Sequence, residues 1–338
     1  MTESIKIWLR DEQSTISTSE SLARSLYSCP VTILLSGPLG AGKTTFVRGL
    51  GRSLGIEGPI TSPTFALEQR YRTHAGVSFT HMDCYRLSRD DALKHLHASE
   101  EHGGIRCIEW SERLPASIID EPSIVVALEE KDGGRNVEMT FRDIALPRSD
   151  DIARWRRTVS LPKNVLQHCD AVGAFASKLA HTLTTYGTVC RPNTLLMAGM
   201  LHDLFRFIDF RDGAGPPGEI PSPEDIATWQ QWKQRWPGLR HETACARFLI
   251  DEGYPALASI VAVHGLTLPA PERSTIEQQL LFYADKRVRG NQVVTLEERF
   301  DDFRKRYSNN ADSDLSRVWY EEAKRVEDAL FPEGAPAS

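Results

Sequence analysis

The stretch Gly37-Pro38-Leu39-Gly40-Ala41-Gly42-Lys43-Thr44 decides the fold of the first half of the chain. It fits the pattern G-x-x-x-x-G-K-[ST] and directly follows the apolar run Val31–Leu35. A buried strand that enters such a turn delivers the chain to a helix N-terminus, where free N–H groups and the positive end of the helix dipole hold a polyphosphate. We therefore predict a nucleotide-binding loop rather than a merely structural glycine turn.

Individual residues of this turn have distinct expected roles. Lys43 would reach the β- and γ-phosphates of a nucleotide, and Thr44 would offer its hydroxyl to Mg²⁺. The backbone completes the cradle, at Gly37, Leu39, Gly40, Ala41 and Gly42. The turn therefore predicts a nucleoside triphosphate and Mg²⁺ as ligands.

Two acidic residues end β-rich runs that follow the turn. Asp83 ends the run 77–83, and Glu109 ends the run 105–109. Both acids are expected at the edge where α/β sheets bind ligands, because the carboxyl ends of parallel strands share that edge. Asp83 is predicted to hold Mg²⁺ opposite Thr44, and Glu109 to position or deprotonate water.

The bulk properties narrow the class of protein. A length of 338 residues favours two domains, and a net charge of -6 gives no overall basic field for nucleic acid. The six cysteines form no C-x-x-C pair, which suits reduced thiols. The first residues carry charges within a short apolar segment, and no run reaches the length of a membrane span. We expect a cytoplasmic protein that does not enter a membrane.

The secondary structure that the sequence predicts changes near residue 145. Before it, short β-rich runs alternate with helical ones, which predicts an α/β unit with parallel and antiparallel strands. A helix over 18–28 is expected to open with Ser17-x-x-Glu20 as a capping box. The Asp-Gly pair in Lys131–Arg135 predicts a hairpin turn.

Apolar residues at helical spacing dominate the second half, and five or six helices are expected between residues 163 and 309. We predict an α/β P-loop NTPase domain with a mixed sheet over 1–144, a charged linker over 145–160, and an all-α domain over 161–330.

Histidines and aspartates mark a second candidate site in the helical half. His168 lies on an apolar helix face, the pair His202-Asp203 ends an apolar helix, and Asp285 lies on a later helix. Burying a carboxylate without a partner is costly, and a divalent cation would compensate its charge. Two imidazoles and two carboxylates from three helices would leave coordination positions open, as hydrolysis requires.

The first half resembles the TsaE (YjeE) family, small bacterial ATPases that assist the TsaB–TsaD complex in the threonylcarbamoyl modification of tRNA adenosine. The resemblance covers residues 5–142. Its motifs are, in order, Gly37–Thr45, Thr61-Ser62-Pro63-Thr64-Phe65, His81-x-Asp83-x-Tyr85-Arg86-Leu87 and Glu109-Trp110.

The resemblance implies roles for several residues. Lys43, Thr44 and Thr45 would bind phosphate and metal, and Asp83 and Glu109 would serve Mg²⁺ and ATP hydrolysis. Trp110 would lie beside the nucleotide, although a position in the hydrophobic core is an equal alternative for it. The loop Ser62–Phe65, with Thr64, would be a switch-like segment near the γ-phosphate. TsaB- and TsaD-like proteins would be the partners. The half lacks basic patches with interleaved aromatic residues, so it would meet tRNA only indirectly.

The second half resembles the HD superfamily of metal-dependent phosphohydrolases, with an HDIG-type closing motif at Tyr283-Ala284-Asp285-Lys286-Arg287. The resemblance covers residues 163–309. It implies a divalent transition metal (Fe, Mn, Co, Ni or Zn) on His168, His202, Asp203 and Asp285, with His241 and His264 available to a second ion or to substrate. Asp203 would also guide a proton. The implied substrate is a nucleotide-like phosphate ester. Among the remaining histidines, those outside the HD pattern are expected to have surface or packing roles: His81, His95, His97, His102 and His181.

Alternatives remain for each half. The first half would also suit a small-molecule kinase, although its arginines are dispersed and form no lid, or an ATP sensor that does not hydrolyse. The second half would also suit a non-catalytic regulatory module whose metal site is vestigial. If none of these alternatives applies, the chain is a bifunctional enzyme in which an ATPase that assists tRNA modification is joined to a phosphohydrolase.

Overall fold

A computed structural model describes residues 2–98, 103–115, 122–211, 213–216, 218–306 and 313–336. The chain forms two compact units. One unit contains Thr2–Ala145 together with Thr182–Arg191, and the other contains Leu146–His181 and Pro192–Ser338. The segment Thr182–Arg191 falls in the range that the sequence assigns to the second domain, and the domain borders themselves stay a prediction.

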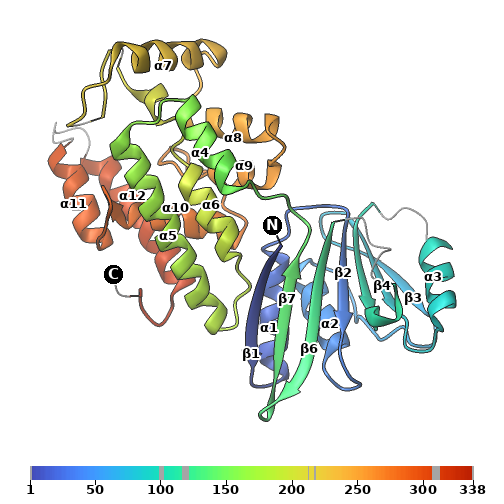
Figure 1. The fold of residues 1–338 in the computed structure, drawn as a ribbon. Helices are drawn as coiled ribbons and strands as arrows, with labels where there is room; N and C mark the ends of the chain where they lie inside the picture. Colours follow the sequence, from blue (N-terminus) through green and yellow to red (C-terminus); the bar gives the residue numbers. More distant parts are fainter. Residues whose placement is uncertain are drawn as a thin grey trace. The chain divides into compact units, whose positions relative to one another are not determined.

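The N-terminal unit is built on a seven-stranded sheet with the strand order β1-β7-β6-β2-β5-β4-β3 (Figure 1). The central strands β6, β2, β5 and β4 are parallel, while β1 with β7, β7 with β6, and β3 with β4 are antiparallel. The predicted mixed sheet is therefore confirmed. The strands are β1 (Glu3–Leu9), β2 (Val31–Ser36), β3 (Glu68–Arg72), β4 (Ser78–Asp83), β5 (Ile105–Glu109), β6 (Ser123–Lys131) and β7 (Gly134–Phe141).

The predicted hairpin turn joins β6 to β7. Lys131 pairs with Gly134, which leaves Asp132 and Gly133 as a two-residue loop. Both loop residues have positive φ, 52° and 76°, as a type I′ turn requires. The Asp-Gly signal in the sequence is thus explained by backbone geometry.

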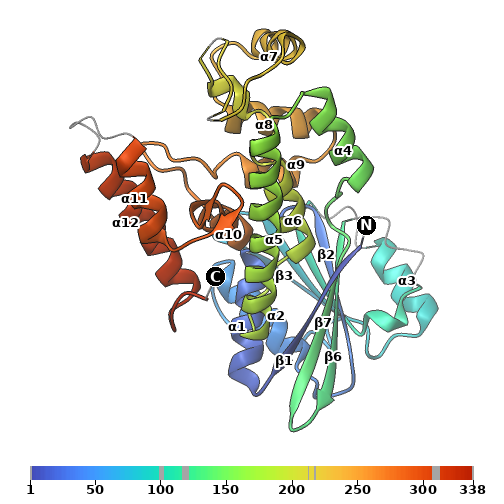
Figure 2. The ribbon, with the colours of Figure 1, turned by 60° about the vertical axis from the view of Figure 1, so that its left-hand side comes forward.

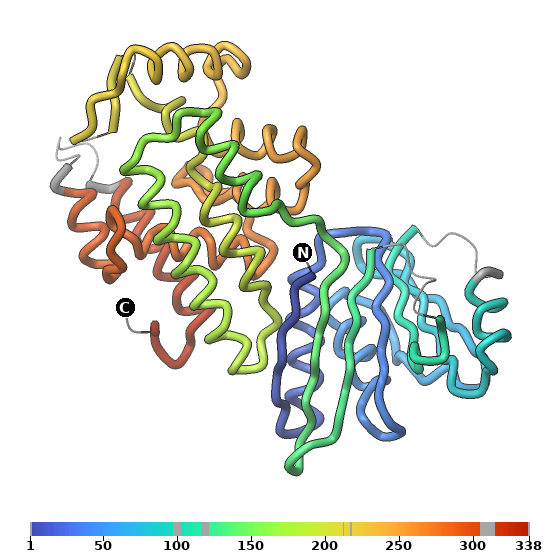
Figure 3. Tube along the Cα trace, in the orientation of Figure 1, coloured from blue at the N-terminus to red at the C-terminus, as the bar shows by residue number. Residues whose placement is uncertain are grey.

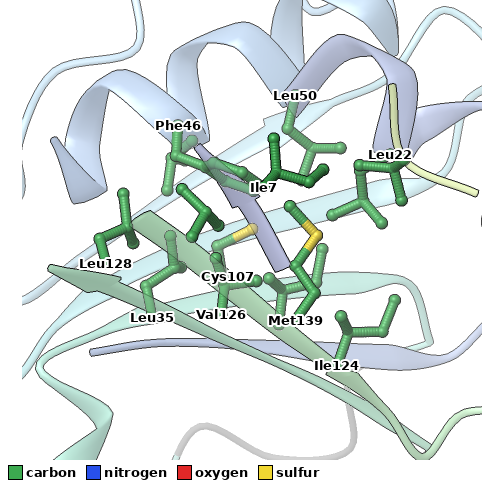
Figure 4. Packing of buried hydrophobic residues seen from close by; sticks show 14 of the residues in the cluster. Ile7, Leu22, Leu35, Phe46, Leu50, Cys107, Ile124, Val126, Leu128 and Met139 are labelled. Atoms are coloured by element: carbon green, nitrogen blue, oxygen red, sulfur yellow. The ribbon is translucent and has the colours of Figure 1, made fainter. Parts of the chain in front are cut away.

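Helices cover both faces of this sheet. Helices α1 (Glu12–Ala23) and α2 (Lys43–Ser53) lie on one face, and α3 (Arg89–Ala98) lies on the other (Figure 2). Side chains of β2 alternate accordingly, because Ile33 and Leu35 join the core under α1 and α2, whereas Leu34 joins the core under α3. Figure 4 shows the larger core. Both faces of the sheet are therefore covered, and the strand ends are left as the place where an α/β sheet binds a ligand.

The first helix corrects the prediction of a helix over 18–28 with a capping box at Ser17. Helix α1 begins at Glu12, because the Asp11 side chain accepts a hydrogen bond of 2.8 Å from the backbone N–H of Ser14. Hydroxyls inside the helix bond back to its own carbonyls, as Ser21 does to Thr18 at 2.7 Å. The abundant Ser and Thr residues therefore do not break the helix.

The C-terminal unit is mostly helical, as predicted (Figure 3). Between residues 163 and 306 its described part contains seven α-helices, not the expected five or six. One reason is that Gly253, with φ of 90°, and Pro255 split one apolar stretch into α8 and α9. No helix in the described ranges is long and apolar enough to cross a membrane. The elements are α4 (Ser149–Thr158), α5 (Lys163–Thr185), α6 (Pro192–Leu201), η3 (Arg206–Asp209), α7 (Pro223–Arg235), α8 (His241–Asp251), α9 (Pro255–Val261), α10 (Ile276–Lys286), α11 (Leu296–Arg306) and α12 (Ser313–Leu330), with the short strands β8 (Val288–Arg289) and β9 (Gln292–Val293).

The segment Thr182–Arg191 is held inside the N-terminal unit by a buried ion pair. Arg191 forms two hydrogen bonds of 2.8 Å to the two carboxylate oxygens of Asp143, and both side chains are fully buried. The same guanidinium donates to the backbone oxygen of Ser25 at 2.6 Å. Val189 lies in the core under α1 and α2. The N-terminal core is thus completed by residues that follow α5.

Arg191→Leu should destabilise the N-terminal unit by about 3–5 kcal/mol, because it leaves the Asp143 carboxylate buried without its partner. Chemical denaturation, followed for the transition of that unit, measures the change. Arg52→Leu is the matched control, since Arg52 pairs with Glu20 in solvent and its loss should cost only about 0–1 kcal/mol. Equal effects of the two changes would contradict the structural role of the buried pair.

Candidate functional site

The turn between β2 and α2 has a backbone that glycine alone accommodates easily. Gly37, Gly40 and Gly42 have φ of 134°, 85° and 98°. A Cβ on Gly37 would collide with the backbone oxygen of Leu128 on the neighbouring strand. Helix α2 then begins at Lys43, directly after the turn. The predicted turn from strand to helix N-terminus is therefore present.

Lys43 folds back over this turn. Its ammonium donates hydrogen bonds to the backbone oxygens of Gly37 at 2.6 Å and Pro38 at 2.8 Å, and the residue is 4% exposed. Burial lowers the pKa of Lys43 below its ordinary value, although the carboxylates of Glu109, Glu112 and Asp83 oppose that shift. The cation is thus held at the turn and within the field of the strand-end acids.

The two predicted acids lie side by side at the ends of β4 and β5. Asp83 and Glu109 are partners in the parallel register, and both are 3% exposed. The Thr44 hydroxyl donates to Oε1 of Glu109 at 2.7 Å. The sheet therefore brings Lys43, Thr44, Asp83 and Glu109 to one edge, as the sequence predicts.

Asp83 also holds the loop that precedes β3. Its Oδ2 atom accepts from the Thr64 hydroxyl at 2.5 Å and from the Ser62 hydroxyl at 3.3 Å. Its Oδ1 atom accepts from the backbone N–H of Tyr85 at 2.8 Å. The predicted switch-like loop Ser62–Phe65 is thus fastened to a carboxylate of the site.

Three further residues were predicted to bind the nucleotide, and one of them contacts Lys43. The ring of Trp110 lies 3.7 Å from Nζ of Lys43 and 4.7 Å from the ring of Tyr85, so Trp110 lies at the site while its body packs on the core beneath α3. The Thr45 hydroxyl instead donates to Oε1 of Glu12 at 3.3 Å. Leu39 is 75% exposed, so its side chain contributes little packing to the turn.

His81 is a residue that sequence reasoning missed. We expected a surface or packing role, yet its Nε2 lies 2.8 Å from Oε1 of Glu109 and the residue is fully buried. The signal was present, because residues two apart on a strand share a face, and His81 precedes Asp83 by two. Of the other histidines without a motif, His102 lies outside the described residues.

The second site gathers residues from five segments of the C-terminal unit. His168 lies on α5, His202 and Asp203 directly follow α6, and His241 is the first residue of α8. His264 follows α9, and Asp285 lies near the end of α10. All of them except His168 are almost completely buried.

Asp285 and Asp203 stand at the centre of this cluster. Oδ1 of Asp285 lies 3.0 Å from Nε2 of His168 and 3.7 Å from Nε2 of His202. Oδ1 of Asp203 lies 3.0 Å from Nε2 of His241 and 3.5 Å from Nε2 of His264. The structure thus brings all six predicted ligands together.

Backbone oxygens orient three of the imidazoles from behind. Nδ1 of His202 lies 2.7 Å from the oxygen of Gly199, Nδ1 of His264 lies 2.6 Å from that of Val261, and Nδ1 of His168 lies 3.0 Å from that of Gly290. A carbonyl oxygen requires the proton on Nδ1, so Nε2 is the ring nitrogen that remains for a metal. Each of the three rings therefore presents a ligand atom to the cluster.

His241 is oriented by a carboxylate instead. Its Nδ1 lies 2.6 Å from Oδ2 of Asp209 and 3.2 Å from Oε2 of Glu242. Sequence reasoning did not single out Asp209 or Glu242, since neither has a spacing that marks it. Arg206 lies beside the same ring, with its Nη1 atom 3.2 Å from Nδ1 of His241.

The charges of the cluster fit a divalent cation. Burial alone would raise the pKa of Asp203, but the neighbouring His202, His241 and Arg206 hold it well below its ordinary value. Burial lowers the pKa of His264 to about 4, so this imidazole is neutral and able to act as a ligand. Nε2 of His202 is buried without a hydrogen-bond partner among the described residues. The carboxylates of the cluster raise the pKa of His202 and His241, although burial alone would lower it, so a bound cation would take the place of their protons. Ionised carboxylates facing imidazole nitrogens are the donor set of a transition metal.

The geometry defines two classes of site, a P-loop edge in one unit and a histidine–aspartate metal cluster in the other. Residues 9–137 match the family model described as threonylcarbamoyl adenosine biosynthesis protein TsaE, and residues 165–290 match the model of the HD domain. The chain belongs to the TsaE family through its N-terminal part, and its C-terminal part carries an HD domain.

Several relatives bear the name tRNA threonylcarbamoyladenosine biosynthesis protein TsaE. The Nostoc protein is 39% identical over 140 residues, which span 40% of this chain and 85% of the relative. The Haemophilus influenzae protein is 33% identical over 143 residues, which span 40% of this chain and 89% of the relative. The solved structure of Bacillus subtilis YdiB is similar at 25% identity and a TM-score of 0.32, and the match covers 42% of this chain and 88% of that one.

Gly37→Ala should destabilise the N-terminal unit by roughly 1–3 kcal/mol and abolish binding of MgATP, because the added methyl collides with the Leu128 carbonyl and distorts the turn. Calorimetric titration and thermal denaturation measure the two effects. Gly133→Ala is the control, since Gly133 also has positive φ but faces open space in the hairpin. It should lose some stability and keep its affinity; unchanged affinity in Gly37→Ala would contradict the assignment of the turn.

Proposed function

We propose that the N-terminal unit is a Mg²⁺-dependent ATPase that assists the threonylcarbamoyl modification of tRNA. One observation carries the proposal: the Thr44 hydroxyl meets Glu109 at 2.7 Å beside Asp83, at the mouth of a turn that begins a helix. A hydroxyl, two carboxylates and a lysine at a helix N-terminus are the groups that phosphoryl transfer needs.

Each group has a task in this proposal. The backbone N–H groups from Gly37 to Thr45 and the Lys43 ammonium bind the phosphates of ATP. The Thr44 hydroxyl and the Asp83 carboxylate hold Mg²⁺, which when bound neutralises charge that develops on the phosphates. Glu109 orients the attacking water and accepts its proton. Trp110 borders the nucleotide, and Thr64 links the loop Ser62–Phe65 to Asp83.

The proposed partners follow from family membership. The relatives are named for tRNA threonylcarbamoyladenosine biosynthesis, and we extend that pathway to this chain. TsaB- and TsaD-like proteins would contact the ATPase unit, and tRNA would be reached only through them. A cytoplasmic location is part of the same proposal.

We further propose that the HD domain hydrolyses a phosphate ester of a nucleotide-like substrate. Nε2 of His202, buried and without a hydrogen-bond partner among the described residues, supports a metal at this point. His168, His202, Asp203 and Asp285 would hold the ion, and His241 and His264 would hold a second ion or contact substrate. A bound divalent cation supplies Lewis-acid activation of water and of a phosphoryl oxygen. Asp203, whose Oδ1 lies near Nε2 of both His241 and His264, would accept a proton from water.

Lys43→Ala should lower ATP turnover by about 100-fold or more while the protein stays folded, because the mutant loses the cation that meets the phosphates. Phosphate release is measured with and without a TsaB–TsaD complex. Lys6→Ala, which removes an exposed lysine on β1, should leave turnover unchanged. If Lys43→Ala and wild type turn over ATP equally, Lys43 does not belong to the site.

His202→Ala and Asp203→Ala should both lose bound metal and phosphoesterase activity, because each removes a ligand of the cluster. Metal analysis of the purified protein and a screen with chromogenic phosphate monoesters and diesters supply the two readouts. His181→Ala is the control, since His181 is an exposed histidine on the same helix as His168. Metal binding without any hydrolysis would favour the regulatory alternative, and equal hydrolysis by all variants would place the activity elsewhere.

A further inference from the structure

His81 is a buried polar side chain for which the proposed ATPase mechanism has no task. It lies on β4 two residues before Asp83, opposite Cys107 of β5 in the parallel register. The residue is fully buried, and its Nε2 lies 2.8 Å from Oε1 of Glu109. A buried polar group that contacts a carboxylate of the site calls for a functional explanation.

Two donors converge on the same oxygen of Glu109. The Thr44 hydroxyl lies 2.7 Å from Oε1 and His81 Nε2 lies 2.8 Å from it, whereas Oε2 receives no hydrogen bond from the described residues. Thr44 has a second task in the proposed function, because its hydroxyl must also serve Mg²⁺. His81 has no other hydrogen-bond partner in the described part of the chain. His81 can therefore keep its hydrogen bond to Glu109 while Thr44 serves Mg²⁺.

The surroundings of the ring also fix which nitrogen carries the proton. Nδ1 of His81 is buried and has no hydrogen-bond partner among the residues described. A proton on Nδ1 would be left unpaired, at a cost of about 1–3 kcal/mol. A proton on Nε2 instead is paired, because it is donated to Oε1 of Glu109. The hydrogen bond thus has one direction and sets the rotation of the carboxylate.

We propose that His81 is a positioning residue for ATP hydrolysis, which holds Oε1 of Glu109 so that Oε2 stays free to orient water. The inference rests on the proposed ATPase function. A carboxylate held through one oxygen has a defined direction for its other lone pairs, and such outer partners commonly contribute 10- to 100-fold to activity.

The test uses the full-length protein with MgATP, and the TsaB–TsaD complex where turnover requires it. His81→Phe keeps the ring volume but removes the donor, and should lower kcat by about 10-fold or more with KM for ATP nearly unchanged. His81→Gln places an N–H donor near the same point and should restore most of the loss. Phe79→Leu is the control, because Phe79 is a buried apolar neighbour on the same face of β4 and has no role in the proposed chemistry.

A double-mutant cycle separates positioning from mere stability. If His81 acts through Glu109, His81→Phe should lower kcat no further in a Glu109→Gln background. All rates are normalised to the folded fraction from circular dichroism. Additive losses in the cycle, or a similar fall of kcat in Phe79→Leu, would overturn the inference.

The outcomes also distinguish this inference from the proposed function. Normal kcat in His81→Phe, with wild-type turnover that depends on Lys43, overturns the positioning role and leaves the ATPase proposal standing. Absence of wild-type turnover with partners present overturns both. If His81→Phe does not fold, His81→Gln decides, because a tenfold loss despite its donor would contradict the account.

Discussion

The chain reversal at Gly37–Gly42 is the constraint on which the N-terminal site depends. Its left-handed glycines let β2 end and α2 begin within six residues, so that Lys43 and Thr44 emerge at the carboxyl edge of the parallel strands. Asp83 and Glu109 end the neighbouring strands at the same edge. Glu109 meets Thr44, and Asp83 lies beside Glu109, because parallel register aligns their strands with the strand that feeds the turn. Any side chain at Gly37 would press on β6 and disturb this alignment.

The HD domain positions its site residues in a different way. Its ligands come from five segments, and no single turn can place them. Backbone oxygens at the ends of two helices hold two of the rings. The oxygen of Gly199 accepts a hydrogen bond from Nδ1 of His202, and the oxygen of Val261 accepts one from Nδ1 of His264. Each bond turns Nε2 toward the carboxylates of Asp203 and Asp285. The ends of helices, where carbonyl oxygens lack partners within the helix, thus become the supports of the metal ligands.

Features set by local sequence could be predicted, and features set by pairing between distant segments could not. The turn at Gly37, the hairpin at Asp132 and the acids at strand ends all follow from short patterns. The predicted start of α1 was wrong. Ser17-x-x-Glu20 has the spacing of a capping box, but the helix is capped at Asp11. The contact of His81 with Glu109 depends on the register between β4 and β5, and that of Asp209 with His241 depends on how η3 meets α8. The sequence also does not reveal that Arg191 would complete the N-terminal core.

A crystal structure with Mg²⁺ and a non-hydrolysable ATP analogue tests the central claim most directly. The account predicts that the triphosphate lies along the backbone from Gly37 to Thr45, that Nζ of Lys43 leaves the oxygens of Gly37 and Pro38 for the phosphates, and that Thr44 and Asp83 contact Mg²⁺. An analogue bound elsewhere, with Lys43 still on those two oxygens, would contradict it.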